Sequence, residues 1–310
     1  MSAGDGRRKS DPAPQCDGAG MPPADRSVNI GAAPVTYGQG DRAPRGDYAH
    51  ARSDYTCEQD WDAYSAADHE LYRRLYERQA AQLPGLACEE FIGAVQHLGS
   101  PRHIPRFDAL SEALYRATRW EVVAVPGLIP EEAFFALLSQ RRFPVTDWIR
   151  KPEEFEYVVE PDVFHDLFGH VPLLFNPMFA DYMQAYGAGG LKASRLEACE
   201  YLARLYWYTV EFGLIDTPHG LRAYGAGILS SAGELRHSIG SPAPRRIGFD
   251  LERIMRTRYT IDSYQASYFV IDSFRQLFDA TAPDFTAVYE RVACLGELAA
   301  DQGLASDRRY

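Results

Sequence analysis

Two histidines lie five residues apart in the segment Pro161-Asp-Val-Phe-His165-Asp-Leu-Phe-Gly-His170-Val-Pro172, surrounded by apolar side chains. Pro161 suits a first helical turn and Pro172 follows the second histidine, which predicts a short helix between them. Five residues of an ideal α-helix turn ~500° and leave the two imidazoles about 140° apart. Both rings can therefore bind one metal ion only if the helix ends or loosens near Gly169.

A second segment, Tyr206-Trp-Tyr-Thr-Val-Glu211-Phe-Gly-Leu-Ile215, carries one carboxylate in an apolar, aromatic helix. Burying Glu211 without a partner costs several kcal/mol, so it needs a cation. Arg204, two helical turns earlier, is one candidate and would make a structural ion pair. A metal ion is the other, because two imidazoles and one carboxylate leave half of an octahedral shell open, as in non-haem iron(II) oxygenases. Taken singly, each histidine is more often a hydrogen-bonded structural residue than a ligand.

Composition indicates one enzyme-sized domain with a tail. The 310 residues are 46% hydrophobic, enough for one substantial core. Residues 1–52 are rich in Gly, Ala, Pro, Asp and Arg and predict a disordered tail, so the catalytic domain is expected at 53–310. The formal charge of −11 makes nucleic acid and anionic membranes unlikely partners. We expect a cytoplasmic protein with reduced thiols, because no signal-peptide core, spanning segment or CxxC pair is present.

Hydrophobic periodicity predicts a mainly α fold with a few short β-strands. One helix begins near His69, and another carries Phe107, Leu110 and Leu114 and precedes the short β-branched strand 120–125. Later helices are expected at about 130–140, 161–170, 178–187, 195–214, 263–281 and 285–300. Nucleotide-binding and repeat folds have no support, since the sequence contains no glycine-rich phosphate loop after a strand and no repeat.

Three motifs resemble the aromatic amino acid hydroxylases in order and spacing, and the resemblance covers about residues 55–285. The motifs are Glu160-Pro-Asp-Val-Phe-His-Asp-Leu-Phe-Gly-His-Val-Pro-Leu-Leu174, Tyr206-Trp-Tyr-Thr-Val-Glu-Phe-Gly-Leu214 and Ala223-Tyr-Gly-Ala-Gly-Ile-Leu-Ser-Ser-Ala-Gly-Glu234. The resemblance implies the catalytic-domain fold of that family and a tetrahydropterin cofactor. It also implies iron(II) bound by His165, His170 and Glu211, with no catalytic side chain beyond these three ligands.

The resemblance also implies the substrate contacts. Arg150 corresponds to the arginine that binds the substrate carboxylate, a task suited to its planar, permanently charged fork. Ser230 is similar to a second carboxylate contact. Pro161 and Trp207 would confine the substrate ring. Without the resemblance, Trp207 would be assigned to ordinary core packing, and Arg150 and Ser230 to solvated loops.

The pterin would lie at the loop Val125-Pro-Gly-Leu-Ile-Pro130, near Gly127 and Leu128, with Phe134 stacked on its ring and Asp166 reaching it through water. Val158 and Pro144 depart from the animal enzymes, so the finer contacts there are open. Only a polar tail precedes Tyr55 and the chain ends soon after its last helix. The regulatory domain and tetramerisation helix of the animal enzymes are therefore not expected, and we expect a monomer.

Substrate preference follows from Ile261, a position that is apolar in the family members acting on phenylalanine and acidic in the animal tyrosine hydroxylases. We expect para-hydroxylation of L-phenylalanine to L-tyrosine with O2, in catabolism or tyrosine synthesis. Tryptophan remains open, because a change of apolar size discriminates weakly. The meta position also remains open, because the resemblance extends to bacterial relatives that hydroxylate there with the same three ligands.

Two alternatives come from other classes. A zinc hydrolase would use the same ligand types, but its HExxH pattern is absent, because Asp166 follows His165 and the histidines are five residues apart. A metal-containing interaction protein without turnover is the other, and the presence of Arg150 with all three ligands argues against it.

Overall fold

The computed structural model describes residues 45–310. Residues 1–44, most of the predicted tail, lie outside the described residues. Residues 45–52 are placed against the folded unit. Asp47 caps a 3-10 turn at Tyr48–His50, and the Tyr48 hydroxyl donates to the Leu128 carbonyl (2.8 Å). The predicted boundary between residues 52 and 53 stays a prediction.

Helices dominate the described residues, as predicted. The α-helices are α1 (Ala66–Ala80), α2 (Glu89–Ala94), α3 (Phe107–Thr118), α4 (Glu131–Ser139), α5 (Val171–Leu174), α6 (Pro177–Arg195), α7 (Cys199–Tyr206), α8 (Ala226–Leu229), α9 (Ala232–Gly240), α10 (Leu251–Arg256), α11 (Phe274–Thr281) and α12 (Thr286–Leu295). Two π-helical segments are η5 (His165–His170) and η6 (Trp207–Glu211). No helix within residues 45–310 has both the length and the apolar character needed to cross a membrane.

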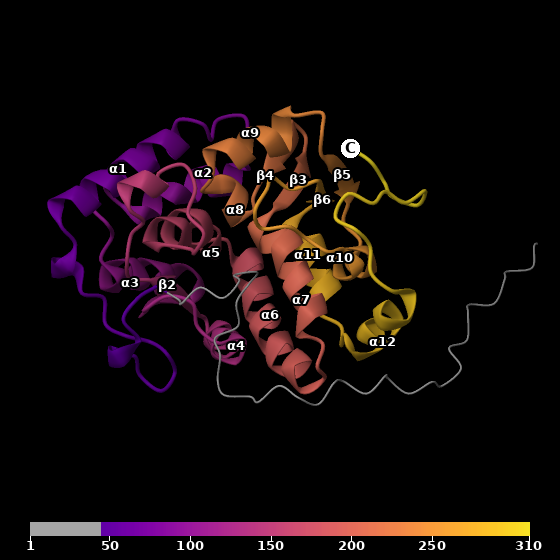
Figure 1. The fold of residues 1–310 in the computed structure, drawn as a ribbon, viewed down its shortest axis with the longest axis horizontal. Helices are drawn as coiled ribbons and strands as arrows, with labels where there is room; N and C mark the ends of the chain where they lie inside the picture. The colour runs from indigo at the N-terminus through magenta and orange to yellow at the C-terminus, as the bar shows by residue number, and fades with distance from the viewer. Residues whose placement is uncertain (1–44) are drawn as a thin grey trace, which may run out of the picture. The chain divides into compact units, whose positions relative to one another are not determined.

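The strands form two small sheets. They are β1 (Glu121–Val125), β2 (Arg142–Thr146), β3 (Gly213–Thr217), β4 (Gly220–Ala223), β5 (Arg245–Gly248) and β6 (Ser267–Ile271). β1 and β2 pair in parallel; the other sheet has the order β4-β3-β6-β5, with only β3 and β4 antiparallel. In Figure 1, β2, α3 and α4 lie to the left of α6, α10 and α11 lie to its right, and β3–β6 with α9 lie above it.

Local sequence explains where the early helices begin and end. Ser65 caps α1 in a capping box with Asp68, each side chain meeting the other's backbone N–H. In α3, Phe107, Leu110 and Leu114 are buried at helical spacing, as predicted. Arg119 then ends α3 in the left-handed region (φ 66°), and the chain turns into β1.

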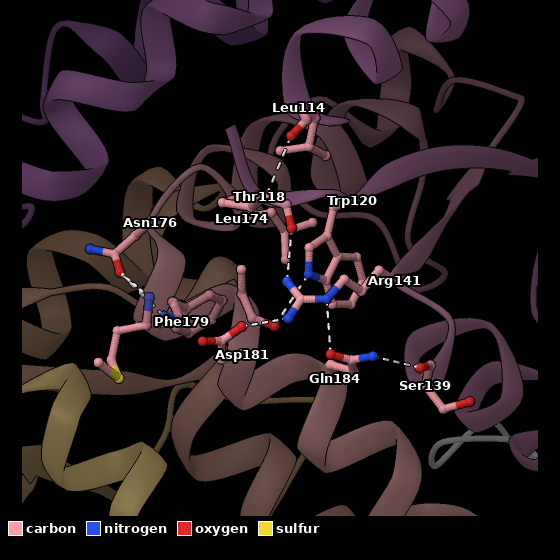
Figure 2. A network of polar contacts seen from close by, with 12 residues as sticks. Leu114, Thr118, Trp120, Ser139, Arg141, Leu174, Asn176, Phe179, Asp181 and Gln184 are labelled. Atoms are coloured by element: carbon pink, nitrogen blue, oxygen red, sulfur yellow. Dashed lines mark hydrogen bonds and ion pairs between the residues drawn. The ribbon is translucent and has the colours of Figure 1, made fainter. Parts of the chain in front are cut away.

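Arg141 holds the turn between α4 and β2 against α6 (Figure 2). Its own backbone lies in the left-handed region (φ 60°). The guanidinium donates to the Thr118 carbonyl (2.8 Å), to Gln184 Oε1 (2.8 Å) and to Asp181. Since these partners come from α3 and α6, one side chain fixes β2 relative to both helices. β2 in turn leads into the loop that carries Arg150.

The segment before and within η5 is anchored in the core. Val163, Phe164, Leu167 and Phe168 are each 0% exposed, and the two phenylalanine rings stack with centroids 5.1 Å apart. Each such side chain contributes roughly 1.5–3 kcal/mol by burial. The histidines of η5 are therefore carried by a rigid, deeply packed segment.

Two predicted helices were wrong in part. The helix expected at 195–214 ends earlier, because β3 begins at Gly213. The helix expected at 263–281 contains β6 before α11 begins at Phe274. All five residues of β6 are buried. Such a continuous apolar run has the same hydrophobic pattern in a central strand as in a buried helix, so periodicity did not separate the two.

Candidate metal centre and substrate cavity

Both segments that carry candidate ligands are π-helical. In a π-helix the hydrogen bonds run from residue i to i+5, so each turn holds more residues than an α-helical turn. His165 and His170 are the first and last residues of η5. The looser turn brings their rings to the same side, which is the loosening that their spacing required. In η6 the Phe212 N–H donates to the Trp207 carbonyl (2.8 Å), closing the same kind of turn around Glu211.

The three candidate ligands converge. His165 Nε2 and His170 Nε2 are 3.2 Å apart, His170 Nε2 lies 3.2 Å from Glu211 Oε1, and His165 Nε2 lies 3.7 Å from Glu211 Oε2. Two imidazole rings and a carboxylate converge on one point. The residues present thus fit a bound metal ion.

The separations between the ligand atoms match those expected around a metal ion. With bonds of about 2.1 Å, neighbouring ligand atoms lie about 3.0 Å apart in an octahedron and about 3.4 Å apart in a tetrahedron. The observed values, 3.2, 3.2 and 3.7 Å, fit either arrangement, so geometry alone admits iron or zinc. Within residues 45–310 this is the one cluster of three His, Cys, Asp or Glu side chains with such spacing.

The alternative partner for Glu211 was wrong. Arg204 instead contacts Glu200, Glu297 and the Met255 carbonyl. Glu211 therefore keeps the two histidines as its charged or chargeable neighbours, which favours the metal interpretation over a structural ion pair.

The protonation states of His165 and Glu211 suit metal binding, whereas His170 would release its proton when a metal binds. Burial lowers the pKa of His165 to about 4, so this ring is neutral at pH 7. Burial also acts to lower the pKa of His170, but the Glu211 carboxylate outweighs it and raises that pKa. Burial acts to raise the pKa of Glu211, and His170 outweighs it and lowers that pKa. An ionised carboxylate and a neutral imidazole are the forms that bind metals.

Helix α8 supports the ligands from behind. Ser230, which follows α8, places its Oγ 2.8 Å from His165 Nδ1, so this contact orients the ring and directs Nε2 toward the other ligands. Close approach needs glycine. A Cβ on Gly169 would lie 2.9 Å from the Ala226 carbonyl oxygen, and one on Gly225 would lie 2.4 Å from the Glu211 carbonyl oxygen. The glycines of these motifs thus allow α8 to pack against both ligand segments.

A cavity of about 600 Å³ opens beside the ligands. His165 and Glu211 line it, together with the four predicted substrate contacts Arg150, Pro161, Trp207 and Ser230. The structure therefore brings these residues together around one cavity. Their individual roles toward a substrate stay predictions.

Arg150 is held by a residue that sequence reasoning missed. Asp162 Oδ2 accepts from Arg150 Nε (2.8 Å) and Oδ1 accepts from Nη2 (2.9 Å), and both side chains are almost fully buried. Nη1 is the guanidinium nitrogen that Asp162 does not engage. Asp162 lies at the start of a helical segment, where an acid is normally assigned to capping, so no local signal marked it as the partner of Arg150.

The predicted pterin contacts are only partly gathered. Leu128 lines the cavity, whereas Gly127, Phe134 and Asp166 do not border it. Phe134 lies one ring behind the cavity, edge-on to Tyr206 (5.7 Å). Asp166 accepts from the Thr146 N–H (2.8 Å), and burial raises its pKa to about 7. These assignments stay predictions.

The far rim of the cavity was also missed. Tyr157, Tyr264 and Gln265 line it, and the Tyr157 hydroxyl donates to the Ile261 carbonyl (2.9 Å). Tyr157 and Tyr264 are 58% and 55% exposed, so in the sequence they look like ordinary surface tyrosines. The Tyr157 contact joins residues 104 positions apart in the sequence, and hydrophobic periodicity carries no information about such contacts.

Comparison with known proteins adds independent evidence. A family model described as biopterin-dependent aromatic amino acid hydroxylase matches residues 33–292. The phenylalanine-4-hydroxylase of Ralstonia nicotianae is 62% identical over 245 residues, which cover 79% of this chain and 78% of that protein. The phenylalanine-4-hydroxylase of Chromobacterium violaceum is 58% identical over 246 residues, covering 79% and 83%.

Solved structures agree in fold. The C. violaceum phenylalanine hydroxylase with bound oxidised Fe(III) superposes with a TM-score of 0.82 at 55% identity, covering 84% of this chain and 96% of that chain. The cobalt-bound structure of the same enzyme gives 0.83, also at 55% identity, covering 84% and 95%. The predicted fold class is confirmed, and the choice of metal that geometry left open falls to iron. The chain therefore belongs to the biopterin-dependent aromatic amino acid hydroxylases, which are pterin-dependent iron monooxygenases.

Proposed function

We propose that this chain converts L-phenylalanine to L-tyrosine with O2 and a tetrahydropterin, at iron(II) held by His165, His170 and Glu211. The observation that carries the proposal is the arrangement around one cavity: two of the ligands border it, and so does the buried Arg150. A zwitterionic amino acid with an apolar ring matches this cavity, because Arg150 offers a cation to its carboxylate and the apolar side chains of Pro161 and Trp207 also line the cavity. Relatives named phenylalanine-4-hydroxylase at 62% and 58% identity support the same reaction.

The chemistry that iron, reduced pterin and oxygen supply when bound is transfer of one oxygen atom to the aromatic ring, with two electrons from the pterin reducing the other atom. The protein's task is then to bind, orient and shield. Holding the metal and an oriented ring side by side would convert an encounter of several molecules into a reaction within one complex.

Arg150 would bind the substrate carboxylate through Nη1. Asp162 accepts from Nε and from one N–H of Nη2, so the guanidinium plane is fixed before substrate arrives. A buried, preoriented cation binds a carboxylate more strongly than a mobile surface arginine, because little entropy is lost on binding. At the other end, Trp207 and Pro161 would confine the ring beside the metal and keep water away.

The apolar side chains that line the cavity support a phenyl ring as the part of the substrate that is hydroxylated. Ile261 lines the cavity, and the other apolar side chains there include Val158, Val159 and Phe212. A phenyl ring leaves no polar atom unpaired against these side chains, whereas a tyrosine hydroxyl would be left without a partner. The cavity volume of about 600 Å³ also admits an indole. Tryptophan therefore remains the nearest competing substrate.

The proposal extends to the setting of the enzyme. We propose that the enzyme is a monomer. Iron(II) and a reduced pterin are both lost in oxidising surroundings, which suits the cytoplasm. Sedimentation velocity of the purified protein at micromolar concentration tests the monomer, and a dimer as the main species would contradict it.

The reaction is tested with iron-loaded protein, a tetrahydropterin, O2 and either phenylalanine or tryptophan, with products separated against para- and meta-tyrosine standards. We expect para-tyrosine, and its loss in Glu211→Ala. Glu77→Ala on the exposed face of α1 is the matched control and should keep full activity. Meta-tyrosine would overturn the ring position, 5-hydroxytryptophan in excess would overturn the substrate, and no hydroxylated product from iron-loaded wild type would overturn the reaction.

A further inference from the structure

The indole of Trp207 is fixed on three sides. Its ring stacks on Tyr259 with centroids 4.3 Å apart and planes 15° apart, and it packs against Phe212 at 4.7 Å. Its Nε1–H donates to Gln265 Oε1 (3.0 Å). Trp207 needs fixing, because a freely rotating indole beside the ligands could not hold a substrate ring in one orientation.

Gln265 uses the rest of its amide on the neighbouring loop. Its Nε2 donates to the carbonyls of Thr260 (2.9 Å) and Ser263 (3.4 Å), and the side chain is only 3% exposed. Ile261, the apolar residue that we propose to favour phenylalanine, lies between Thr260 and Ser263 in the sequence. One buried amide therefore joins the Trp207 indole to the loop that carries Ile261.

The direction of the amide is fixed by its partners. An indole N–H only donates and a backbone carbonyl only accepts. Turning the amide over would place NH2 against the Trp207 N–H and oxygen against two carbonyl oxygens, so all three contacts would become repulsive. No other orientation of Gln265 satisfies this network, and the side chain acts as a fixed link.

The link is anchored behind the cavity wall. The Gln265 backbone N–H donates to Glu234 Oε1 (3.2 Å), and the same carboxylate oxygen accepts from the Tyr268 hydroxyl (2.5 Å). Glu234 lies in α9 and is 4% exposed, and Tyr268 lies in the central strand β6. Gln265 is thus held by its backbone to two buried elements while its side chain holds the indole.

We infer that Gln265 is a positioning residue that locks the Trp207 ring to the Thr260–Ser263 loop and thereby sets which aromatic side chain the cavity accepts. This inference rests on the proposed hydroxylation of phenylalanine. Without the amide, the indole and the loop can separate. The cavity then widens on the side of Ile261 and tolerates a larger ring.

Two substitutions separate the contacts. Gln265→Met is similar in length and removes the acceptor and both donors. Gln265→Glu keeps an acceptor for the indole N–H but sets carboxylate oxygen against the Thr260 and Ser263 carbonyls. With each contact controlling about three- to tenfold in binding, Gln265→Met should raise the KM for phenylalanine about tenfold or more. The ratio of kcat/KM for phenylalanine over tryptophan should fall with it, while the KM for the pterin changes less than about twofold.

Gln59→Met is the matched control. The Gln59 amide also makes two hydrogen bonds to backbone, to the Pro105 carbonyl (3.0 Å) and from the Phe107 N–H (2.8 Å), and it does not border this cavity. It should lower the thermal midpoint without changing substrate preference. An unchanged phenylalanine to tryptophan ratio in Gln265→Met would overturn the inference, and so would an equal shift in Gln59→Met.

A spectroscopic readout keeps the inference apart from the proposed reaction. The indole N–H resonance of Trp207, assigned by its loss in Trp207→Phe, is recorded in the 15N–1H spectrum of unreacted protein. It should move upfield in Gln265→Met and stay near its original position in Gln265→Glu. If wild type gives no hydroxylated product, the proposed function fails, and this shift still reports whether Gln265 holds the indole. An unmoved resonance in Gln265→Met would overturn the positioning role.

Discussion

Replacing Asp162 by asparagine tests whether the buried pair orients Arg150. Oδ2 of Asp162 accepts from the Arg150 backbone N–H (2.9 Å) and Nε (2.8 Å), and Oδ1 accepts from Nη2 (2.9 Å) and from the His165 N–H (3.0 Å). An asparagine has one acceptor oxygen, so either orientation of its amide sets NH2 against two N–H donors. The substitution therefore removes the negative charge and two of the four hydrogen bonds.

The cost follows from burial. The side chains of Arg150 and Asp162 are 4% and 0% exposed, so water does not replace the lost partner. Breaking a buried pair by removing one partner costs about 3–5 kcal/mol of unfolding free energy. A guanidinium that is no longer held should also lose much of a charge-assisted contact with the substrate. Since such a contact is worth about 1.5–3 kcal/mol, the KM for phenylalanine should rise about 10- to 100-fold.

Urea unfolding and steady-state kinetics measure the two effects. The matched control is Glu77→Gln, which neutralises the acid of an exposed pair with Arg73 on α1 and should cost less than about 1 kcal/mol with no change in KM. If Asp162→Asn loses less than about 1 kcal/mol and keeps the wild-type KM, the pair neither stabilises the fold nor orients Arg150, and the reasoning fails.

Three further predictions use other parts of the structure. Gly187→Ala would place a Cβ 2.4 Å from backbone of α4 and should cost about 1–3 kcal/mol, whereas Gly189→Ala on the same helix meets nothing within 4 Å and should be neutral or stabilising in thermal unfolding. Ser230→Ala removes the partner of His165 Nδ1 and should weaken iron binding about 10- to 100-fold in a competitive chelator titration; an unchanged affinity would contradict the orienting role. Because the pKa of Asp162 is lowered in the folded state, where Arg150 outweighs burial, its contribution to stability is present above an unfolded pKa of about 3.9 and is lost as the pH falls below it. The urea midpoint of Asp162→Asn should therefore depend less on pH in that range than that of wild type.

The candidate ligands could be predicted from the sequence because each lies in a distinctive local setting. A carboxylate within an aromatic helix needs a cation, and two histidines in an apolar segment supply the other donors. The contacts that orient these residues could not be predicted from the sequence, for a physical reason. Ser230 meets His165 across 65 residues, and Gln265 meets Trp207 across 58 residues. Neither contact leaves a periodic or compositional trace in the chain.

The strand β6 shows the same limit for the fold. Its five residues are all buried, so the alternation that marks a half-exposed strand is missing. Only its place between β3 and β5 makes it a strand. Helix α3 was predicted correctly because only one of its faces is buried, so its apolar residues recur with the helical period.

The histidine spacing lies between these cases. An α-helix would separate His165 and His170 by about 140°, so the local propensity and the proposed chemistry conflict. The structure resolves the conflict with a π-helical turn, and it uses the same turn at Trp207–Glu211. Such turns have few advantages of their own and occur mostly where function requires them. Here dense packing around η5 and the close approach of α8 hold both turns in place. Burial of the core side chains therefore stabilises the backbone conformation that directs His165, His170 and Glu211 toward one point.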